Sequence, residues 1–287
     1  MSTQLFDTIG IVQKYDDPEK VSGDVLDIEY FCHDSEGLFD VKIIPEEQYN
    51  DRTLIIALGG DGTVMTACRL AAKTGSMVIG VNHGNLGFLA DVNASGLMQK
   101  LLRELLTAQD DEYNIQHRHL LSSKITTTDG QVDHSNFAVN EFHISSSNGR
   151  VLEYVLEIDG RQAAHHTADG VIVSSPTGST AYSLSAGGAI MMPTLQAMQI
   201  VPVAPHMLTS RPLIVGEQHE VAIRVKADRE VFIRCDGIDV ECAPHNNEYV
   251  IKTRIGRQTV GLVKYSDSKH NFFDVMKEKL YYGRRGL

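Results

Sequence analysis

Short apolar runs alternate with longer amphipathic stretches along the first third of the chain. Four of these runs are continuous and rich in β-branched residues, as in strands buried inside a parallel sheet: 8–12, 40–44, 54–58 and 77–81. Helical periodicity follows at 63–72 and again at 98–106. This alternation predicts an α/β domain, in which ligands bind where the parallel strands end.

From about Tyr113 the pattern changes to strands separated by turns. Runs typical of strands occupy 120–128, 151–158, 162–174, 220–225, 230–235, 249–253 and 259–263. Asp159-Gly160 and Asp236-Gly237 read as hairpin turns, and a helical pattern returns at 271–280. We expect an α/β N-terminal Rossmann-like domain over 1–113 and a mostly antiparallel all-β C-terminal domain over 114–268. The C-terminal helix, within 269–287, should return to the first domain.

Composition and charge narrow the class of protein. The 287 residues are 42% hydrophobic, which is enough to bury a full core. No apolar run is as long as a membrane span, and the first residues lack a signal-peptide pattern, so we expect a cytoplasmic protein with no membrane partner. The four cysteines form no CxxC pair, which argues against a zinc site or a disulfide framework. A formal charge of −11 argues against a nucleic-acid partner, so any anionic ligand must be held by local donors.

The segment Gly59-Gly60-Asp61-Gly62-Thr63 lies between the buried run 54–58 and the helical pattern after it. Glycines let backbone N–H groups approach a ligand closely, and a helix N-terminus attracts anions, so this turn suits phosphate groups. A carboxylate beside phosphate groups is electrostatically unfavourable, so Asp61 is expected to have a chemical role, such as accepting a proton from a hydroxyl or holding a metal counterion. Gly-Asp-Gly alone is as often a simple tight turn, but the flanking strand and helix favour a site.

Two further segments carry candidate chemistry. The stretch 174–188 bears eight hydroxyl groups, more than a capping site needs, and forms either a polar ligand wall or a solvated loop. Asn140 and Glu141 interrupt an apolar run at 139–144. Because neighbouring side chains on a strand face opposite sides, one of the two should be buried and need a partner. That partner is either a structural hydrogen bond within the protein or the hydroxyls of a ligand.

These segments occur in the order found in bacterial NAD kinases, and the chain resembles that family. The resemblance runs from about Ile9 to the C-terminal helix and is weakest before Leu54. The glycine turn alone also resembles those of diacylglycerol kinases, sphingosine kinases and phosphofructokinases. The matching motifs are Gly59-Gly60-Asp61-Gly62-Thr63, Asn82-x-Gly84-x-Leu86-Gly87-Phe88-Leu89, Asn140-Glu141, Asp169-Gly170 and Pro176-Thr177-Gly178-Ser179-Thr180-Ala181-Tyr182-Ser183-Leu184-Ser185-Ala186-Gly187-Gly188.

The resemblance implies a phosphotransferase with an alcohol acceptor. It would move a phosphoryl group from ATP, with Mg²⁺, to the 2′-hydroxyl of the adenosine ribose of NAD and so make NADP. Asp61 would be the catalytic base, Gly59, Gly60 and Gly62 would cradle phosphates, and no side chain is assigned to the metal. Family members are homo-oligomers, commonly tetramers, that complete the NAD site across subunits. The positions matching further NAD contacts are Asn140, Glu141, His166, Asp169, Thr180, Ala181, Tyr182, Ser183, Ser185 and Ala204.

One departure and several alternatives stay open at this point. His165 and His166 precede Asp169 where many relatives carry a basic residue, and His166 could replace that residue as a donor. A lipid kinase would need an apolar cleft, and a sugar kinase would need basic residues on a sugar phosphate. A non-catalytic NAD(P) sensor would gain nothing from a carboxylate facing phosphates. The phosphoryl donor (ATP, another nucleotide or polyphosphate) and the use of NADH also stay open.

Overall fold

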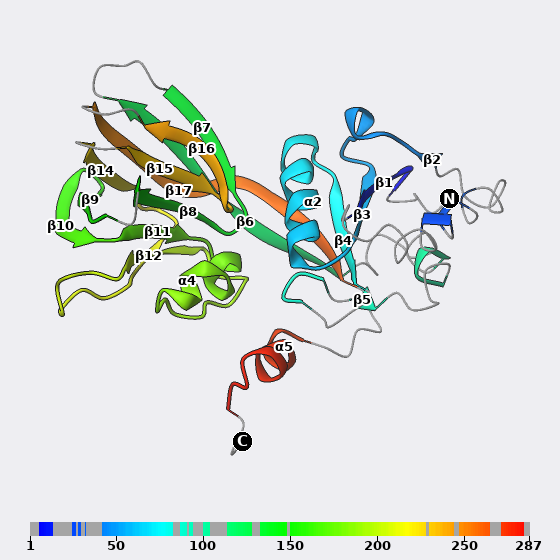
Figure 1. Cartoon of the computed structure of the whole chain (residues 1–287). Helices are drawn as coiled ribbons and strands as arrows, with labels where there is room; N and C mark the ends of the chain where they lie inside the picture. Colours follow the sequence, from blue (N-terminus) through cyan, green and yellow to red (C-terminus); the bar gives the residue numbers. More distant parts are fainter. Residues whose placement is uncertain are drawn as a thin grey trace. The chain divides into compact units, whose positions relative to one another are not determined.

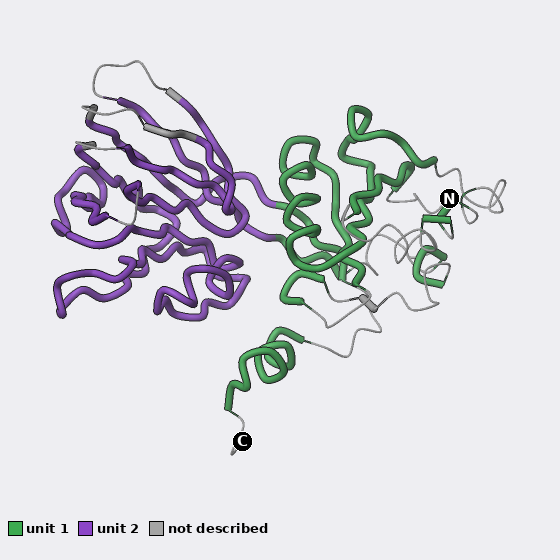
Figure 2. Tube along the Cα trace, viewed as in Figure 1, with its two compact units in different colours: residues 1–117, 260–287 green, residues 118–259 purple. Residues whose placement is uncertain are grey.

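The computed structural model divides into two compact units (Figures 1 and 2). Unit 1 comprises residues 1–117 and 260–287, and unit 2 comprises residues 118–259. No helix in the described part of the chain is long and apolar enough to cross a membrane. The described residues are 6–13, 25–26, 28–29, 32, 42–82, 87–90, 92–93, 100–103, 114–127, 133–147, 150–227, 230–243, 247–264 and 271–283.

Unit 1 is built on a parallel sheet, as the continuous apolar runs predict. In the order β2-β1-β3-β4-β5, each strand pairs in parallel with the next. All six residues of β3 are buried, so both faces of that strand are covered. The 3-10 helix η1 spans Glu46–Gln48. The strands are β1 (Thr8–Gln13), β2 (Lys42–Ile43), β3 (Thr53–Leu58), β4 (Met77–Asn82) and β5 (Val92–Asn93).

The sheet order predicts a ligand-binding position between β1 and β3. The chain passes from β1 to β2 on one side, and β3 then pairs with β1 on the other side. In open α/β sheets, the crevice beyond the strand ends at such a reversal is where ligands bind. Helix α2 (Asp61–Thr74) begins there directly after β3, with Gly60 as its N-cap, and ends at Gly75 in the left-handed conformation (φ +80°).

Unit 2 is antiparallel. Six described strands form the order β13-β12-β11-β8-β15-β16, while β10, β9, β14 and β17 form a second run. One hydrophobic cluster joins residues from both runs. The elements are β6 (Asn114–Thr127), β7 (Asp133–Ala138), β8 (Glu141–Ser146), β9 (Leu152–Ile158), β10 (Arg161–Ala168), β11 (Gly170–Ser174), η3 (Thr177–Thr180), α4 (Tyr182–Ser185), β12 (Ala197–Val203), β13 (Leu213–Gly216), β14 (Val221–Ala227), β15 (Val231–Cys235), β16 (Ile238–Ala243) and β17 (Asn247–Lys264).

The two Asp-Gly turns form as predicted, whereas some strand limits differ. Both turns have positive φ at both residues (+51° and +74° at 159–160, +50° and +80° at 236–237), as type I′ hairpins require. The segments predicted at 249–253 and 259–263 are one continuous strand, β17, and the segment 162–174 is two strands that separate at Asp169. Of the predicted helix at 98–106, the residues 100–103 are described and helical, and residues 83–86 of the second glycine loop lie outside the described chain.

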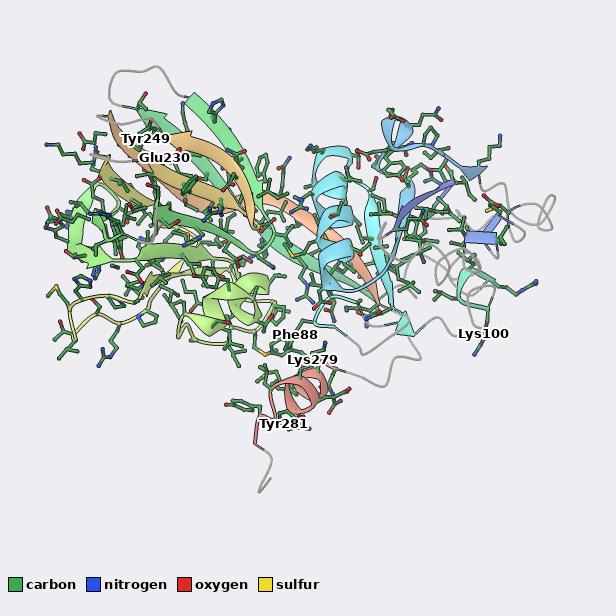
Figure 3. The ribbon with its side chains drawn as sticks, in the orientation of Figure 1. Phe88, Lys100, Glu230, Tyr249, Lys279 and Tyr281 are labelled. Carbon is green, nitrogen blue, oxygen red and sulfur yellow. The ribbon has the colours of Figure 1, made fainter. Side chains whose placement is uncertain are left out.

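Helix α5 (Phe272–Lys279) confirms the predicted C-terminal helix, which belongs to unit 1. Its N-terminus has a capping box: the Asn271 side chain accepts hydrogen bonds from the N–H groups of Phe273 and Asp274. The ring of Phe272 lies 6.0 Å from the ring of Phe88 (centroid to centroid; Phe88 is labelled in Figure 3). The helix therefore contacts the loop that carries the second glycine motif.

Candidate functional site

The glycine turn forms a sharp connection from β3 into α2. The Gly59 N–H donates to the Val81 carbonyl on the neighbouring strand (2.8 Å), and the Thr63 N–H donates to the Gly60 carbonyl (2.9 Å). A side chain at Gly59 would collide with that of Thr63, and its φ of +153° also favours glycine. The first N–H groups of a helix have no partner within the helix, so the turn presents anion-binding donors.

The Asp61 carboxylate is held by the second glycine loop. Its Oδ2 accepts the Phe88 N–H (2.9 Å), and its Oδ1 accepts the N–H groups of Leu89 (3.1 Å) and Ala90 (3.2 Å). A Cβ atom at Gly87 would overlap this carboxylate. The two glycine motifs, separate in sequence, are therefore parts of one structure.

These bonds leave Asp61 one place to act. A carboxylate offers about four lone-pair positions, two on each oxygen. The Leu89 and Ala90 N–H groups use both positions on Oδ1, whereas Phe88 uses one on Oδ2. Among the described residues nothing occupies the second position on Oδ2, where a hydroxyl can donate.

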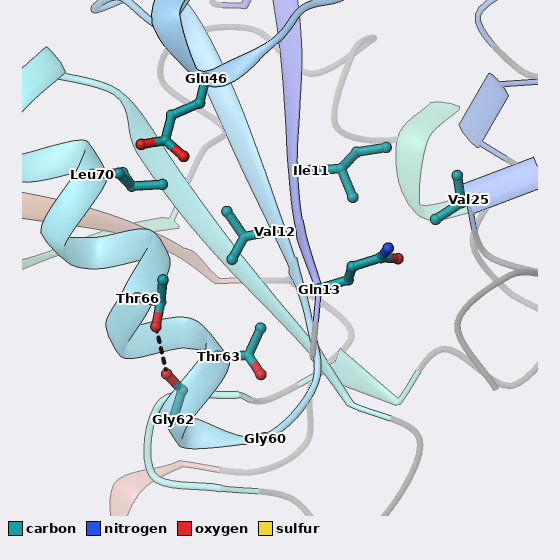
Figure 4. Close-up of a pocket in the computed structure, with 10 residues that line it drawn as sticks. All are labelled: Ile11, Val12, Gln13, Val25, Glu46, Gly60, Gly62, Thr63, Thr66 and Leu70. Atoms are coloured by element: carbon teal, nitrogen blue, oxygen red, sulfur yellow. Dashed lines mark hydrogen bonds between the residues drawn. The ribbon is translucent and has the colours of Figure 1, made fainter. Parts of the chain in front are cut away.

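A cavity of about 790 Å³ opens beside this turn, at the crevice where the sheet order reverses (Figure 4). One end has backbone from the glycine turn, and Glu46 and Leu70 lie toward the other end. Apolar side chains lie between these ends, so the cavity offers phosphate donors, an apolar wall and a carboxylate. It is lined by Ile11, Val12, Gln13, Val25, Glu46, Gly60, Gly62, Thr63, Thr66 and Leu70.

In unit 2 the structure brings the Asn140–Glu141 pair against the hydroxyl-rich segment. The Ser175 N–H donates to the Asn140 carbonyl (2.8 Å), and the Ser175 hydroxyl donates to the Val139 carbonyl (2.6 Å). Gly178 lies so close to the Asn140 backbone that a Cβ atom would overlap it. The two segments, predicted separately, therefore form one cluster.

Glu141 and Asn140 are both buried, at 7% and 8% exposure. The prediction that one of the pair would be buried assumed that both lie on a strand. Both are buried, because Asn140 lies in a bend and β8 begins at Glu141. Burial, reinforced by the negative charge of Asp236, raises the pKa of Glu141 to about 8. Its Oε2 has no hydrogen-bond partner among the described residues. Glu141 is therefore a buried, neutral acid at pH 7 with hydrogen-bonding capacity left over.

The predicted residues at 180–185 differ in their surroundings. Tyr182 is 43% exposed and meets the His143 ring edge-on at 5.1 Å. Burial and the nearby Arg234 lower the pKa of His143 to about 4, so this ring is neutral at pH 7. Ser183 is fully buried, and its hydroxyl accepts a hydrogen bond from Gln199 (2.8 Å). Thr180 and Ala181 are partly buried, and Ser185 is exposed.

His166, Asp169 and Ala204 lie together at the opposite end of β11. The Asp169 N–H donates to the Val203 carbonyl (2.9 Å), which places Asp169 next to Ala204. The His166 Nδ1 lies 3.1 Å from the Ser210 hydroxyl, and burial beside His165 lowers its pKa. Five residues of β11 separate this group from Ser175, a span of roughly 16 Å.

The sequence places the glycine loop that includes Phe88 and Leu89 at a strand end, but it does not predict that the backbone of residues 88–90 binds Asp61, or that Asp236 takes part in the site. Asp236 had been interpreted only as a turn residue, yet its carboxylate accepts the N–H groups of residues 139–141. The N–H groups of 88–90 bind Asp61 through backbone atoms, which leave no residue-type signal. The sequence feature that could have indicated Asp236 is an aspartate followed by glycine at the end of a predicted strand, the same pattern as at Asp61.

Comparison with known proteins decides the family. A model described as the ATP-NAD kinase N-terminal domain matches residues 13–110, and one described as the ATP-NAD kinase C-terminal domain matches residues 139–264. An NAD kinase of Pseudomonas putida is 39% identical over 238 residues, which are 81% of this chain and 76% of that protein. The chain belongs to the NAD kinase family. This confirms the resemblance found in the motifs.

Solved NAD kinase-family structures share the fold. Yeast NADH kinase complexed with NADH gives a TM-score of 0.82 at 23% identity, and covers 98% of this chain and 89% of that chain. An NAD kinase from Archaeoglobus fulgidus in complex with ATP gives a TM-score of 0.68 at 20% identity, and covers 93% and 98%. At these identities the likeness establishes the fold, an α/β domain followed by an antiparallel β domain.

We expect Gly87→Ala to lower kinase turnover by about 10-fold or more, because the added methyl group displaces the Asp61 carboxylate, and a shift of about 1 Å can cost up to about 10² in rate. Steady-state assays with ATP and NAD measure the effect, and circular dichroism checks the fold. Wild-type turnover in a folded variant would contradict this arrangement of Asp61.

We expect Glu141→Gln to change how stability depends on pH. The folded wild type keeps the Glu141 proton to about pH 8, whereas the unfolded chain releases it near 4.5. The wild type should therefore lose stability relative to the variant as pH rises between these values, by about 1.4 kcal/mol per pH unit at most. Urea unfolding at pH 5, 6, 7 and 8 measures the difference. Glu153→Gln, at an exposed side chain of the same unit, is the control. A stability difference between wild type and Glu141→Gln that stays constant with pH would show that Glu141 is already ionised at pH 5.

Proposed function

We propose that this chain transfers the γ-phosphoryl group of ATP to the 2′-hydroxyl of the adenosine ribose of NAD, giving NADP and ADP. Family membership supports the overall reaction. The observation that carries the chemistry is the Asp61 carboxylate, fixed by three backbone N–H groups with one acceptor position left. The glycine turn alone also fits the lipid- and sugar-kinase alternatives, whereas the two NAD kinase family models match parts of both units.

Asp61 acts as the base in this proposal. The ribose hydroxyl donates to the free position on Oδ2, which orients its oxygen toward the γ-phosphorus. Because phosphoryl transfer has a loose transition state, the proton leaves late, as the new O–P bond forms and the bond to ADP breaks. The proton then passes to Asp61, and the fixed N–H groups hold the carboxylate in place during the transfer.

The cavity at the glycine turn is the proposed donor site. Backbone N–H groups at Gly60 and Gly62 face the phosphates in this proposal, while the apolar side chains offer a surface for the base. The N–H groups of Gly59 and Thr63 already donate to the Val81 and Gly60 carbonyls, so the predicted phosphate contact of Gly59 is not available through its N–H. Among the described residues, no group of three or more His, Cys, Asp or Glu side chains could hold a metal ion. In this proposal Mg²⁺ would be bound mainly by the ATP phosphates and water, with Asp61 of the glycine turn as the candidate carboxylate, since Glu46 lies toward the other end of the cavity. Bound there, the cation offsets charge on the transferring group.

Asn140 and Glu141 are the proposed contacts for the adenosine portion of NAD. A neutral Glu141 can donate a hydrogen bond as well as accept one, which suits a ligand with ribose hydroxyls and ring nitrogens. Thr180, Ala181, Tyr182 and Ser185 offer partly buried or exposed surface beside this pair for the adenine and nicotinamide ends. Ser183 contributes indirectly, because its buried hydroxyl binds Gln199.

We also propose a homo-oligomer, commonly a tetramer in this family, in the cytoplasm. His166, Asp169 and Ala204 lie about one strand length from Asn140 and Glu141, so they suit the NAD bound to a neighbouring copy. An apolar surface near Ala204 supports this. Leu208 is 91% exposed, and the edge strand β13 exposes Leu213 and Ile214.

We expect purified protein to form NADP from NAD and Mg-ATP, with ADP released only when NAD is present. A coupled NADP assay, repeated with other nucleotides, polyphosphate and NADH, also defines the donor and acceptor range. Formation of no NADP with any donor would overturn the proposed function.

We expect Asp61→Asn to lower kcat by about 100-fold or more while NAD affinity changes by less than about 3-fold, since a positioned base contributes about 10²–10⁴ in rate. In this variant the side-chain NH₂ of the introduced asparagine replaces one of the two acceptor oxygens and therefore faces a backbone N–H donor without forming a hydrogen bond. The melting temperature should fall as a result. Asp51→Asn, at an exposed carboxylate of unit 1, is the control. Equal losses in turnover and NAD binding would instead assign Asp61 a structural role.

A further inference from the structure

The segment 139–141, which carries Asn140 and Glu141, is held by hydrogen bonds to its backbone. Asp236 accepts all three of its N–H groups: Val139 on Oδ2 (3.0 Å), and Asn140 (2.7 Å) and Glu141 (3.2 Å) on Oδ1. Ser175 donates to the carbonyls of Val139 and Asn140, and the Asp236 N–H donates to that of Glu141 (3.0 Å). All six backbone polar groups are thus satisfied by two residues.

Asp236 supplies four of these six hydrogen bonds, all from one hairpin turn. Val139 and Asn140 lie between β7 and β8, and Glu141 is the first residue of β8, where it pairs with Ser174 of β11. Hydrogen bonds to a charged carboxylate are stronger than those between neutral groups. The place and direction of the Asn140 and Glu141 side chains therefore depend chiefly on this carboxylate.

The turn itself does not require this arrangement, as a second turn in the same unit shows. Asp159-Gly160 has the same type I′ conformation, with φ of +51° and +74°. The Asp159 carboxylate accepts one backbone N–H, from Glu220 (3.0 Å), and lies 2.6 Å from His219 Nδ1 on the surface. Aspartate suits the first position of either turn, so turn formation alone does not explain three N–H groups converging on Asp236.

We propose that Asp236 is a positioning residue for the acceptor: its carboxylate holds residues 139–141 in the conformation that lets Asn140 and Glu141 bind NAD. This inference rests on the proposed function and concerns how the acceptor is held, without a part in the chemical step. The negative charge of Asp236 also favours the protonated form of the neighbouring Glu141. The same carboxylate thus sets both the position and the hydrogen-bonding character of the acceptor contact.

Two substitutions at Asp236 and the same two at Asp159 test the proposal. Asn and Gly both tolerate positive φ, so Asp236→Asn and Asp236→Gly preserve the hairpin while removing part or all of the acceptor. Asp159→Asn and Asp159→Gly make equal changes in the other Asp-Gly turn and serve as matched controls. The full-length variants are assayed for KM of NAD, KM of ATP, kcat and melting temperature.

We expect KM for NAD to rise by about 10-fold or more in Asp236→Gly and by a smaller factor in Asp236→Asn, because lost hydrogen bonds to a charged group each change an equilibrium by roughly this amount. KM for ATP should stay within about 2-fold, as should both KM values in the Asp159 variants. Direct NAD titration by calorimetry separates binding from turnover. It also reports on any Asp236 variant that is too slow to assay.

The outcomes separate this inference from the function on which it rests. Wild-type protein that makes no NADP would overturn the proposed function. Active wild type with an unchanged KM for NAD in both Asp236 variants would overturn the positioning role alone. Equal increases in both KM values, or equal losses in the Asp159 variants, would show a general structural effect and would also overturn it.

Discussion

The hydrogen bonds from residues 88–90 to the Asp61 carboxylate are the constraint on which the candidate site depends. They join the loop after β4 to the start of α2, and they explain why Gly87 has no room for a side chain. They also resolve an electrostatic difficulty, because a carboxylate at a phosphate-binding turn would otherwise oppose its ligand. Three N–H dipoles offset its charge, and a single position on Oδ2 stays open for a hydroxyl.

An aspartate that accepts three consecutive N–H groups occurs in unit 2 as well, but there the candidate ligand contacts lie on the segment that donates the N–H groups and not on the aspartate. There the carboxylate of Asp236 serves as the anchor, and the three N–H groups belong to the segment that carries the candidate ligand contacts. In both units an aspartate binds three consecutive N–H groups and thereby fixes a segment next to a strand: residues 88–90 after β4, and residues 139–141 at the start of β8. A chain with a net charge of −11 has no general attraction for anionic nucleotides, so the proposed nucleotide binding depends on local donors such as the backbone N–H groups of the glycine turn.

Local chemistry made most elements predictable from the sequence. Continuous β-branched runs identified β1, β3 and β4, and Asp-Gly pairs identified both type I′ turns. The errors came where tertiary packing decides: β17 continues through Gly256, and the 162–174 segment breaks at Asp169. Motif spacing selected Asp61, Asn140 and Glu141 as candidate site residues, and their roles stay predictions. It did not find the backbone donors at 88–90 or the role of Asp236, because both depend on contacts between residues distant in sequence.

The central claim is that Asp61 is held by the loop with one position free for the acceptor hydroxyl. A crystal structure of the protein with NAD bound tests it most directly. We expect the 2′-hydroxyl of the adenosine ribose within hydrogen-bond distance of Asp61 Oδ2, with the bonds from Phe88, Leu89 and Ala90 unchanged. A carboxylate that leaves these N–H groups, or a ribose bound away from Asp61, would contradict the account.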